Sequence, residues 1–120
     1  MKTKDNTIQT IKLHPDLKEL MVVIDPLWGL CFKGNDCVLT SGHEETTAHS
    51  VKSKHYIRNN PSGYGCAIDI RINDVTLNEG HNYFAMILMY IKLFFDDRVE
   101  VMIERIPNPD RHLHFQVKNN

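Results

Sequence analysis

Seven of the 120 residues are histidines, which is an unusually high share, so histidine is the first residue type to consider for a functional site. Imidazole is the commonest metal ligand in proteins and also serves as a general base near neutral pH. Two of the histidines form the triplet His112-Leu113-His114. In an extended strand alternate side chains lie on the same side, about 6.5–7 Å apart along the strand. A pair of imidazoles on a polar strand face could therefore bind a metal ion.

A carboxylate and a third imidazole could complete such a site. Asp69 stands between two isoleucines in a segment that we expect to form an internal strand, where an unpaired charge would be costly. A metal ion or a cationic partner would explain its presence there. His55, in a long polar segment, adds a third ligand of a suitable type. Two imidazoles and one carboxylate, with the fourth position open, are typical of a catalytic zinc site and not of a closed structural one.

These residues can meet only if a sheet turns them to one side. Residues 66–72 and 112–117 alternate between polar and apolar side chains, which predicts two strands, each with one face on the core. The face away from the core carries Ala67, Asp69 and Arg71 in the first segment and His112, His114 and Gln116 in the second. Residues 99–104 predict a further strand, which the turn at 107–110 joins to residues 112–117 as a hairpin.

The remaining elements complete a small α+β fold. Residues 37–40 predict another strand, and residues 41–65 form a long polar stretch of the kind that is commonly functional. Helical spacing begins at Pro15, and Asp25-Pro26 should end that helix, because the residue before a proline avoids the α region. A second helix should cover residues 80–95, while the polar residues 1–12 should fray. We expect one mostly antiparallel sheet with helices on one face and the polar residues on the other.

Composition excludes several classes of protein. The formal net charge of −1 argues against binding to nucleic acid or to an anionic membrane surface. Three cysteines without a CxxC pair argue against a disulfide framework or a four-cysteine zinc site. The polar N-terminus lacks the apolar region of a secretory signal, and the longest apolar run, residues 83–91, is far below the ~20 residues of a membrane span. We expect a single domain over residues 1–120 that is cytoplasmic when made.

The same residues occur in an order that resembles a known family. Ser53-Lys54-His55-Tyr56 is followed by Gly65-Cys66-Ala67-Ile68-Asp69-Ile70-Arg71, and Glu104 precedes the histidine triplet at 112–114. This order is similar to the motifs SxHxxGxAxD, an acid and HxH of the zinc D-alanyl-D-alanine and L-alanyl-D-glutamate peptidases. The branch most alike shares the hedgehog/DD-peptidase fold. The resemblance extends from about residue 39 to the C-terminus.

The resemblance implies a role for each matching residue. His55, Asp69 and His114 correspond to the family's zinc ligands. Glu104 corresponds to the acid that acts as general base. His112 corresponds to the first histidine of HxH, which helps to stabilise the transition state.

Two further residues would contact substrate, and two spacings depart from the family. Ser53 matches the serine of the first motif, and Arg71 could meet a substrate carboxylate. Residues 58–63 form an insertion between the first ligand and the aspartate, which should protrude beside the site as a turn. The interval between Glu104 and His112 is also longer than usual, so that Asp110 remains a rival for the general base.

The other histidines have simpler interpretations. His14, His43 and His81 are expected to face solvent. His49 is expected to order the polar loop or to support a ligand from behind.

Three functions compete. The first is a Zn²⁺-dependent peptidase acting on peptidoglycan stem peptides, as in phage lysins or bacterial wall-remodelling enzymes; such a protein would be a monomer that acts on the cell wall after release. The second is a non-catalytic zinc-containing binding or structural module, for example a phage virion component. The third is a purely structural role for the histidines. The presence of both Glu104 and the HxH motif favours the enzyme.

Overall fold

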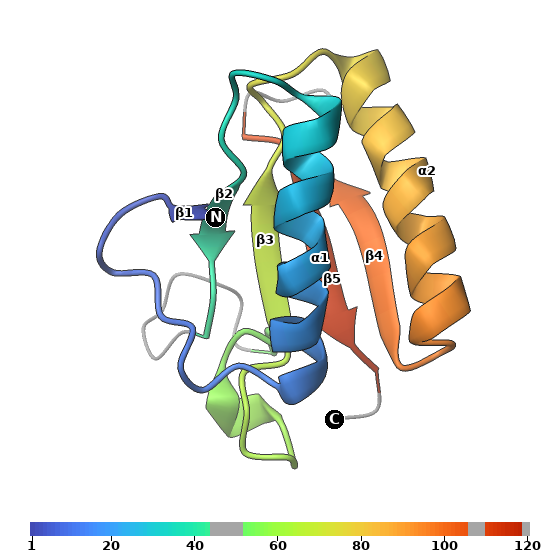
Figure 1. The fold of residues 1–120 in the computed structure, drawn as a ribbon. Helices are drawn as coiled ribbons and strands as arrows, with labels where there is room; N and C mark the ends of the chain where they lie inside the picture. The colour runs from blue at the N-terminus through green and yellow to red at the C-terminus, as the bar shows by residue number, and fades with distance from the viewer. Residues whose placement is uncertain (44–51, 106–109, 119–120) are drawn as a thin grey trace.

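A five-stranded sheet with two helices forms the computed structural model, which describes residues 1–43, 52–105 and 110–118 (Figure 1). The strands are β1 (Lys2–Thr3), β2 (Val38–Ser41), β3 (Ala67–Arg71), β4 (Val99–Glu104) and β5 (His112–Val117), in the spatial order β1-β2-β3-β5-β4. β1 pairs with β2 in parallel, and every other neighbouring pair is antiparallel. The expected α+β class with a mostly antiparallel sheet is confirmed.

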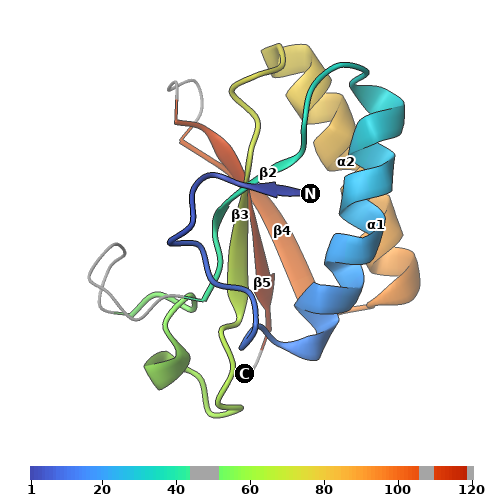
Figure 2. The same ribbon diagram turned by 60° about the vertical axis from the view of Figure 1, so that its left-hand side comes forward.

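Both long helices cover the same face of the sheet. Figure 2 views the sheet nearly edge-on, with α1 (Pro15–Cys31) and α2 (Leu77–Phe94) on one side and the N-terminal segment on the other. A short 3₁₀ helix, η1 (Ile57–Asn59), lies in the segment before β3. Among the described residues, no helix combines the length and apolar character that crossing a membrane would require.

The hydrophobic core lies between the sheet and the helices. Ile68 and Ile70 of β3 and Leu113 and Phe115 of β5 are fully buried there, as the alternation of polar and apolar residues predicts. Tyr83 of α2 is buried too and donates a hydrogen bond of 2.7 Å to the backbone carbonyl of Ile24 in α1. This contact ties the two helices together and fixes the layer that supports the sheet.

A capping box fixes the beginning of α2. The Thr76 hydroxyl accepts from the Glu79 amide at 3.1 Å, and the Glu79 carboxylate accepts from the Thr76 amide at 3.0 Å. The two side chains satisfy donors that a helix N-terminus otherwise leaves without partners. The helix therefore begins at Leu77, slightly earlier than the sequence indicates.

The first helix does not end at Asp25-Pro26, contrary to the sequence-based expectation. α1 continues to Cys31 with Pro26 inside it. Proline has no backbone N–H, so the Val22 carbonyl lacks its helical hydrogen bond. Both Pro26 and Val22 are exposed. Two residues further on, Trp28 is 1% exposed and packs edge-on against Tyr83, with ring centroids 5.1 Å apart. Burial of this indole outweighs the local cost of the proline.

Backbone hydrogen bonds join the N-terminal residues, which the sequence predicts to fray, to the sheet. The amides of Lys2 and Lys4 donate to the carbonyls of Cys37 and Leu39 at 2.9 and 2.8 Å. Further along, the His43 amide donates to the Gln9 carbonyl at 2.9 Å. Gly42 permits this close approach, because a Cβ there would overlap the Gln9 carbonyl oxygen.

Candidate metal centre

The pairing of β3, β5 and β4 brings the polar residues together on the face away from the helices. Asp69 lies opposite His114, and Arg71 lies opposite His112 in the antiparallel register of β3 and β5. Glu104 lies opposite His112 in the register of β4 and β5. The expectation that Asp69, His112 and His114 share the open face of the sheet is confirmed.

His55 reaches the same place from the loop before β3. Its amide donates to the Ser53 hydroxyl at 3.1 Å, and the Cys66 amide donates to the neighbouring Lys54 carbonyl at 2.9 Å. The Asn60 side-chain amide donates to the carbonyls of Lys54 and Tyr56 at 2.9 and 3.0 Å. The backbone on both sides of His55 is therefore fixed, and the imidazole itself is 2% exposed.

Three side chains converge on one point. His114 Nδ1 is 2.8 Å from one carboxylate oxygen of Asp69, and His55 Nε2 is 3.2 Å from the other. All three residues are buried, and their candidate ligand atoms lie within 4.8 Å of one another. The ligand atoms of a tetrahedral zinc ion are about 3.3 Å apart, so small adjustments would admit an ion.

The outer ring nitrogens of both histidines have carbonyl partners. His55 Nδ1 donates to the Gly42 carbonyl at 2.9 Å, and His114 Nε2 donates to the Gln116 side-chain carbonyl at 3.0 Å. Such bonds turn the remaining nitrogen of each ring toward Asp69, which is the usual arrangement of metal-ligating histidines. His55, Asp69 and His114 are thus positioned to bind a metal ion, and their donor set suits one.

Without a metal ion, the charges of Asp69 and His114 stabilise each other. Burial would raise the pKa of the Asp69 carboxyl, but hydrogen bonds from His114 and His55 and the positive charge of the nearby imidazoles hold that pKa well below its ordinary value. Burial would lower the pKa of His114, but the hydrogen bond and charge of Asp69 raise it above its ordinary value. The buried carboxylate therefore favours a cationic neighbour.

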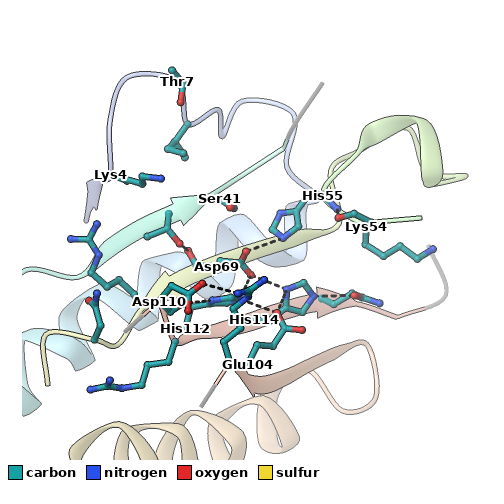
Figure 3. Close-up of a pocket in the computed structure, with 18 of the residues that line it drawn as sticks. Lys4, Thr7, Ser41, Lys54, His55, Asp69, Glu104, Asp110, His112 and His114 are labelled. Atoms are coloured by element: carbon teal, nitrogen blue, oxygen red, sulfur yellow. Dashed lines mark hydrogen bonds and ion pairs between the residues drawn. The ribbon is translucent and has the colours of Figure 1, made fainter. Parts of the chain in front are cut away.

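Glu104 and His112 lie beside these three residues (Figure 3). Glu104 Oε1 is 2.9 Å from His112 Nε2 and 3.6 Å from His114 Nδ1. The other candidate base, Asp110, pairs its carboxylate with Arg105 at 2.9 Å. Of the two carboxylates, that of Glu104 contacts the imidazoles around the candidate metal position.

A cleft of about 1110 Å³ opens over the three metal-binding candidates and over both expected substrate-binding residues, Ser53 and Arg71. The Arg71 guanidinium is 4.0 Å from Asp74 and partly exposed, which leaves it able to contact a ligand. Lys4, Asp5, Thr7 and Ile8 of the N-terminal segment also line the cleft. Sequence reasoning missed this wall, because its residues follow no hydrophobic period and are held by backbone hydrogen bonds.

The other histidines differ from one another in their surroundings. His43 is 6% exposed, so the expectation that it faces solvent is wrong. His14 is partly buried and caps α1 by accepting from the Asp16 amide at 3.1 Å. His81 is exposed as expected, whereas the expectation for His49 falls outside the described residues.

Comparison with protein-family models, curated proteins and solved structures finds no match to this chain.

Proposed function

We propose that the protein is a zinc-dependent peptidase that hydrolyses peptide bonds in peptidoglycan stem peptides. One observation carries the proposal: the Glu104 carboxylate lies 3.6 Å from His114 Nδ1, beside the buried set of His55, Asp69 and His114 in an open cleft. A ligand set of two imidazoles and a carboxylate, with a further carboxylate beside it, is the composition of a hydrolytic zinc centre.

His55, Asp69 and His114 would hold the zinc ion. When bound, zinc supplies a Lewis acid that polarises the scissile carbonyl and activates water. The hydrogen bonds from His55 to Gly42 and from His114 to Gln116 keep both imidazoles oriented for this task.

Glu104 would move the proton. Its side chain is 40% exposed at the cleft, so it can accept a proton from the attacking water and pass it to the leaving amine. His112, whose Nε2 adjoins Glu104, would donate a hydrogen bond to the developing oxyanion. The Asp110 carbonyl fixes the other side of this ring, 3.0 Å from Nδ1.

The cleft offers a basic side chain to a peptide that carries carboxylates. Arg71 reaches the cleft from β3 next to the catalytic residues, where it can pair with a substrate carboxylate. Stem peptides carry such groups beside both candidate bonds, D-Ala–D-Ala and L-Ala–D-Glu. The resemblance of the motifs, rather than the cleft alone, supports this choice of substrate.

Digestion of purified peptidoglycan with the zinc-loaded protein, followed by mass analysis of the products, tests the proposal. A carboxypeptidase would release free D-alanine, and an endopeptidase would leave peptides that begin with D-glutamate. The Glu104→Gln variant, loaded with zinc in the same way, is the control. Intact peptidoglycan after treatment with the zinc-loaded parent would contradict the peptidase and favour a zinc-containing binding module.

A further inference from the structure

Asp69 faces a second group of ligand atoms in addition to His55 and His114. Its Oδ1 is 3.7 Å from His112 Nε2, which in turn is 2.9 Å from Glu104 Oε1. These three ligand atoms, one each from Asp69, Glu104 and His112, also lie within 4.8 Å of one another. The distances of 3.7 and 2.9 Å from His112 Nε2 to the two carboxylates are again close to the spacing of about 3.3 Å between ligands of a tetrahedral zinc ion.

The two groups differ in exposure. The side chains of His55, Asp69 and His114 are at most 10% exposed, whereas those of His112 and Glu104 are 17% and 40% exposed. Ligands that remain open to water exchange a bound ion more readily than a buried set. The second group also offers one imidazole where the first offers two.

We infer that Asp69, Glu104 and His112 form a second, weaker position for a divalent cation next to the first. Asp69 adjoins ligands of both groups, since its Oδ2 is 3.2 Å from His55 Nε2 and its Oδ1 is 2.8 Å from His114 Nδ1 and 3.7 Å from His112 Nε2. Its carboxylate would therefore be shared by the two ions. Repulsion from an ion already bound at the first position would weaken the second further. The positions would therefore fill in order, the buried one first.

The second ion would regulate the site, a consequence that rests on the proposed function. A cation held by Glu104 and His112 occupies the lone pair with which Glu104 accepts a proton and removes the donor that His112 offers to the oxyanion. Zinc beyond one equivalent should then slow hydrolysis, even though the first equivalent is required for it.

Equilibrium dialysis against increasing zinc, with elemental analysis of the protein, tests the inference without reference to activity. The parent protein should bind two ions with separate affinities. Glu104→Gln and His112→Ala should each keep the tight ion and lose the weak one, whereas His81→Ala, at an exposed histidine, should bind both. Saturation of the parent at one ion would overturn the inference, and so would a second ion that both site variants retain.

The inference and the proposed function fail in different ways. A protein that binds two ions, the second through Glu104 and His112, but hydrolyses no stem peptide would contradict the peptidase and support the second ion position. A peptidase that saturates at one ion would remove only the second position. Full activity with the second ion bound at Glu104 would overturn the regulatory consequence.

Discussion

Asp69 carries the charge that organises the open face of the sheet. Its carboxylate oxygens lie 2.8 Å from His114, 3.2 Å from His55 and 3.7 Å from His112. A buried carboxylate without a cationic neighbour would be strongly destabilising. In the metal-free protein His114, whose pKa the hydrogen bond and charge of Asp69 raise, provides a balancing charge, and a metal ion bound at Asp69 would do the same.

The pair of His114 and Asp69 predicts how the stability of the metal-free protein depends on pH. The pKa of His114 is raised, so its contribution is fully present below about pH 6.5 and is lost as pH rises through the raised pKa. The pKa of Asp69 is lowered, so its contribution is present above about pH 4 and is lost as pH falls through the lowered pKa. Urea unfolding in the presence of a chelator should show this pair contributing most between about pH 4 and 6.5.

The matched control for that measurement is His114→Gln, which removes the titrating ring. The variant should lose less stability than the parent between pH 6.5 and 8, because it has no proton to give up there. Parallel profiles for parent and variant over that interval would show that the pair does not contribute.

Glu104 and Asp110 can be separated as candidates for the general base. Glu104→Gln should retain the tight zinc ion and the fold, yet lower the rate of stem-peptide hydrolysis by roughly 10²–10⁴-fold, because an amide cannot accept the proton. Asp110→Asn should have little effect, since that carboxylate is paired with Arg105. Rates measured at one equivalent of zinc decide the matter, and the reverse pattern would transfer the role to Asp110.

At the scale of elements, the loop before β3 depends on one buried side chain. The Asn60 amide donates to the carbonyls of Lys54, Tyr56 and Tyr64, at 2.9, 3.0 and 2.7 Å. Two of these carbonyls belong to the neighbours of His55. The segment 58–63, which the resemblance marks as an insertion beside the site, thus includes the residue that fixes the backbone around His55, a candidate metal ligand.

Asn60→Ala should therefore weaken zinc binding by about 10–100-fold, as removal of a residue that supports a metal ligand commonly does. Competition with a chromogenic chelator measures the affinity, and thermal unfolding shows whether the variant is folded. Asn73→Ala, at an exposed residue that lines the cleft, is the control. An unchanged zinc affinity in a folded Asn60→Ala protein would mean that the loop holds His55 without this amide.

The proline inside α1 gives a prediction about stability. Pro26→Ala should raise the free energy of unfolding by about 1–3 kcal/mol, because the alanine restores the hydrogen bond to the Val22 carbonyl and has a higher helix propensity. Gly29→Ala, where an added Cβ meets nothing within 4 Å, should add only about 0.5–1 kcal/mol. Urea unfolding compares the two; a Pro26→Ala protein less stable than the parent would show that the ring itself is needed.

The sequence predicts the strands that carry the site correctly but not the end of α1. The alternation around Asp69 is forced by burial of one face, so pattern and structure agree there and at His112 and His114. The end of α1 could not be read locally, because the packing of Trp28 against Tyr83 overrides the preference of the residue before Pro26. Local propensity decides an element only where tertiary contacts do not oppose it.

At the scale of the whole molecule, the helices and the candidate metal centre occupy opposite faces of one sheet (Figure 2). β3 and β5 serve both faces, because their apolar residues pack against the helices while the alternate residues form the site. Asp69 and His114 are therefore held in place by strands that are packed into the core. Such support suits a site whose ligands must hold their positions before the ion arrives.

The parts of the site that sequence reasoning missed are held by long-range backbone contacts. The Gly42 carbonyl that orients His55 and the N-terminal wall that begins at Lys4 carry no side-chain pattern that would reveal them. Backbone groups are the same in every residue, so their pairing across the fold follows from topology. By contrast, Asp69, His112 and His114 could be placed together from the alternation of their strands, while Glu104 is indicated only by the resemblance, and the strand register then brings it to His112.

X-ray absorption spectroscopy of the protein loaded with one equivalent of zinc tests whether His55, Asp69 and His114 bind the ion. The site of His55, Asp69 and His114 predicts a first shell of nitrogen and oxygen only, at about 2.0–2.2 Å, with the outer-shell scattering of two imidazoles. It also predicts that Asp69→Asn loses this spectrum together with the ion. A sulfur ligand at about 2.3 Å, or an unchanged spectrum in the Asp69→Asn protein, would contradict a metal centre formed by His55, Asp69 and His114.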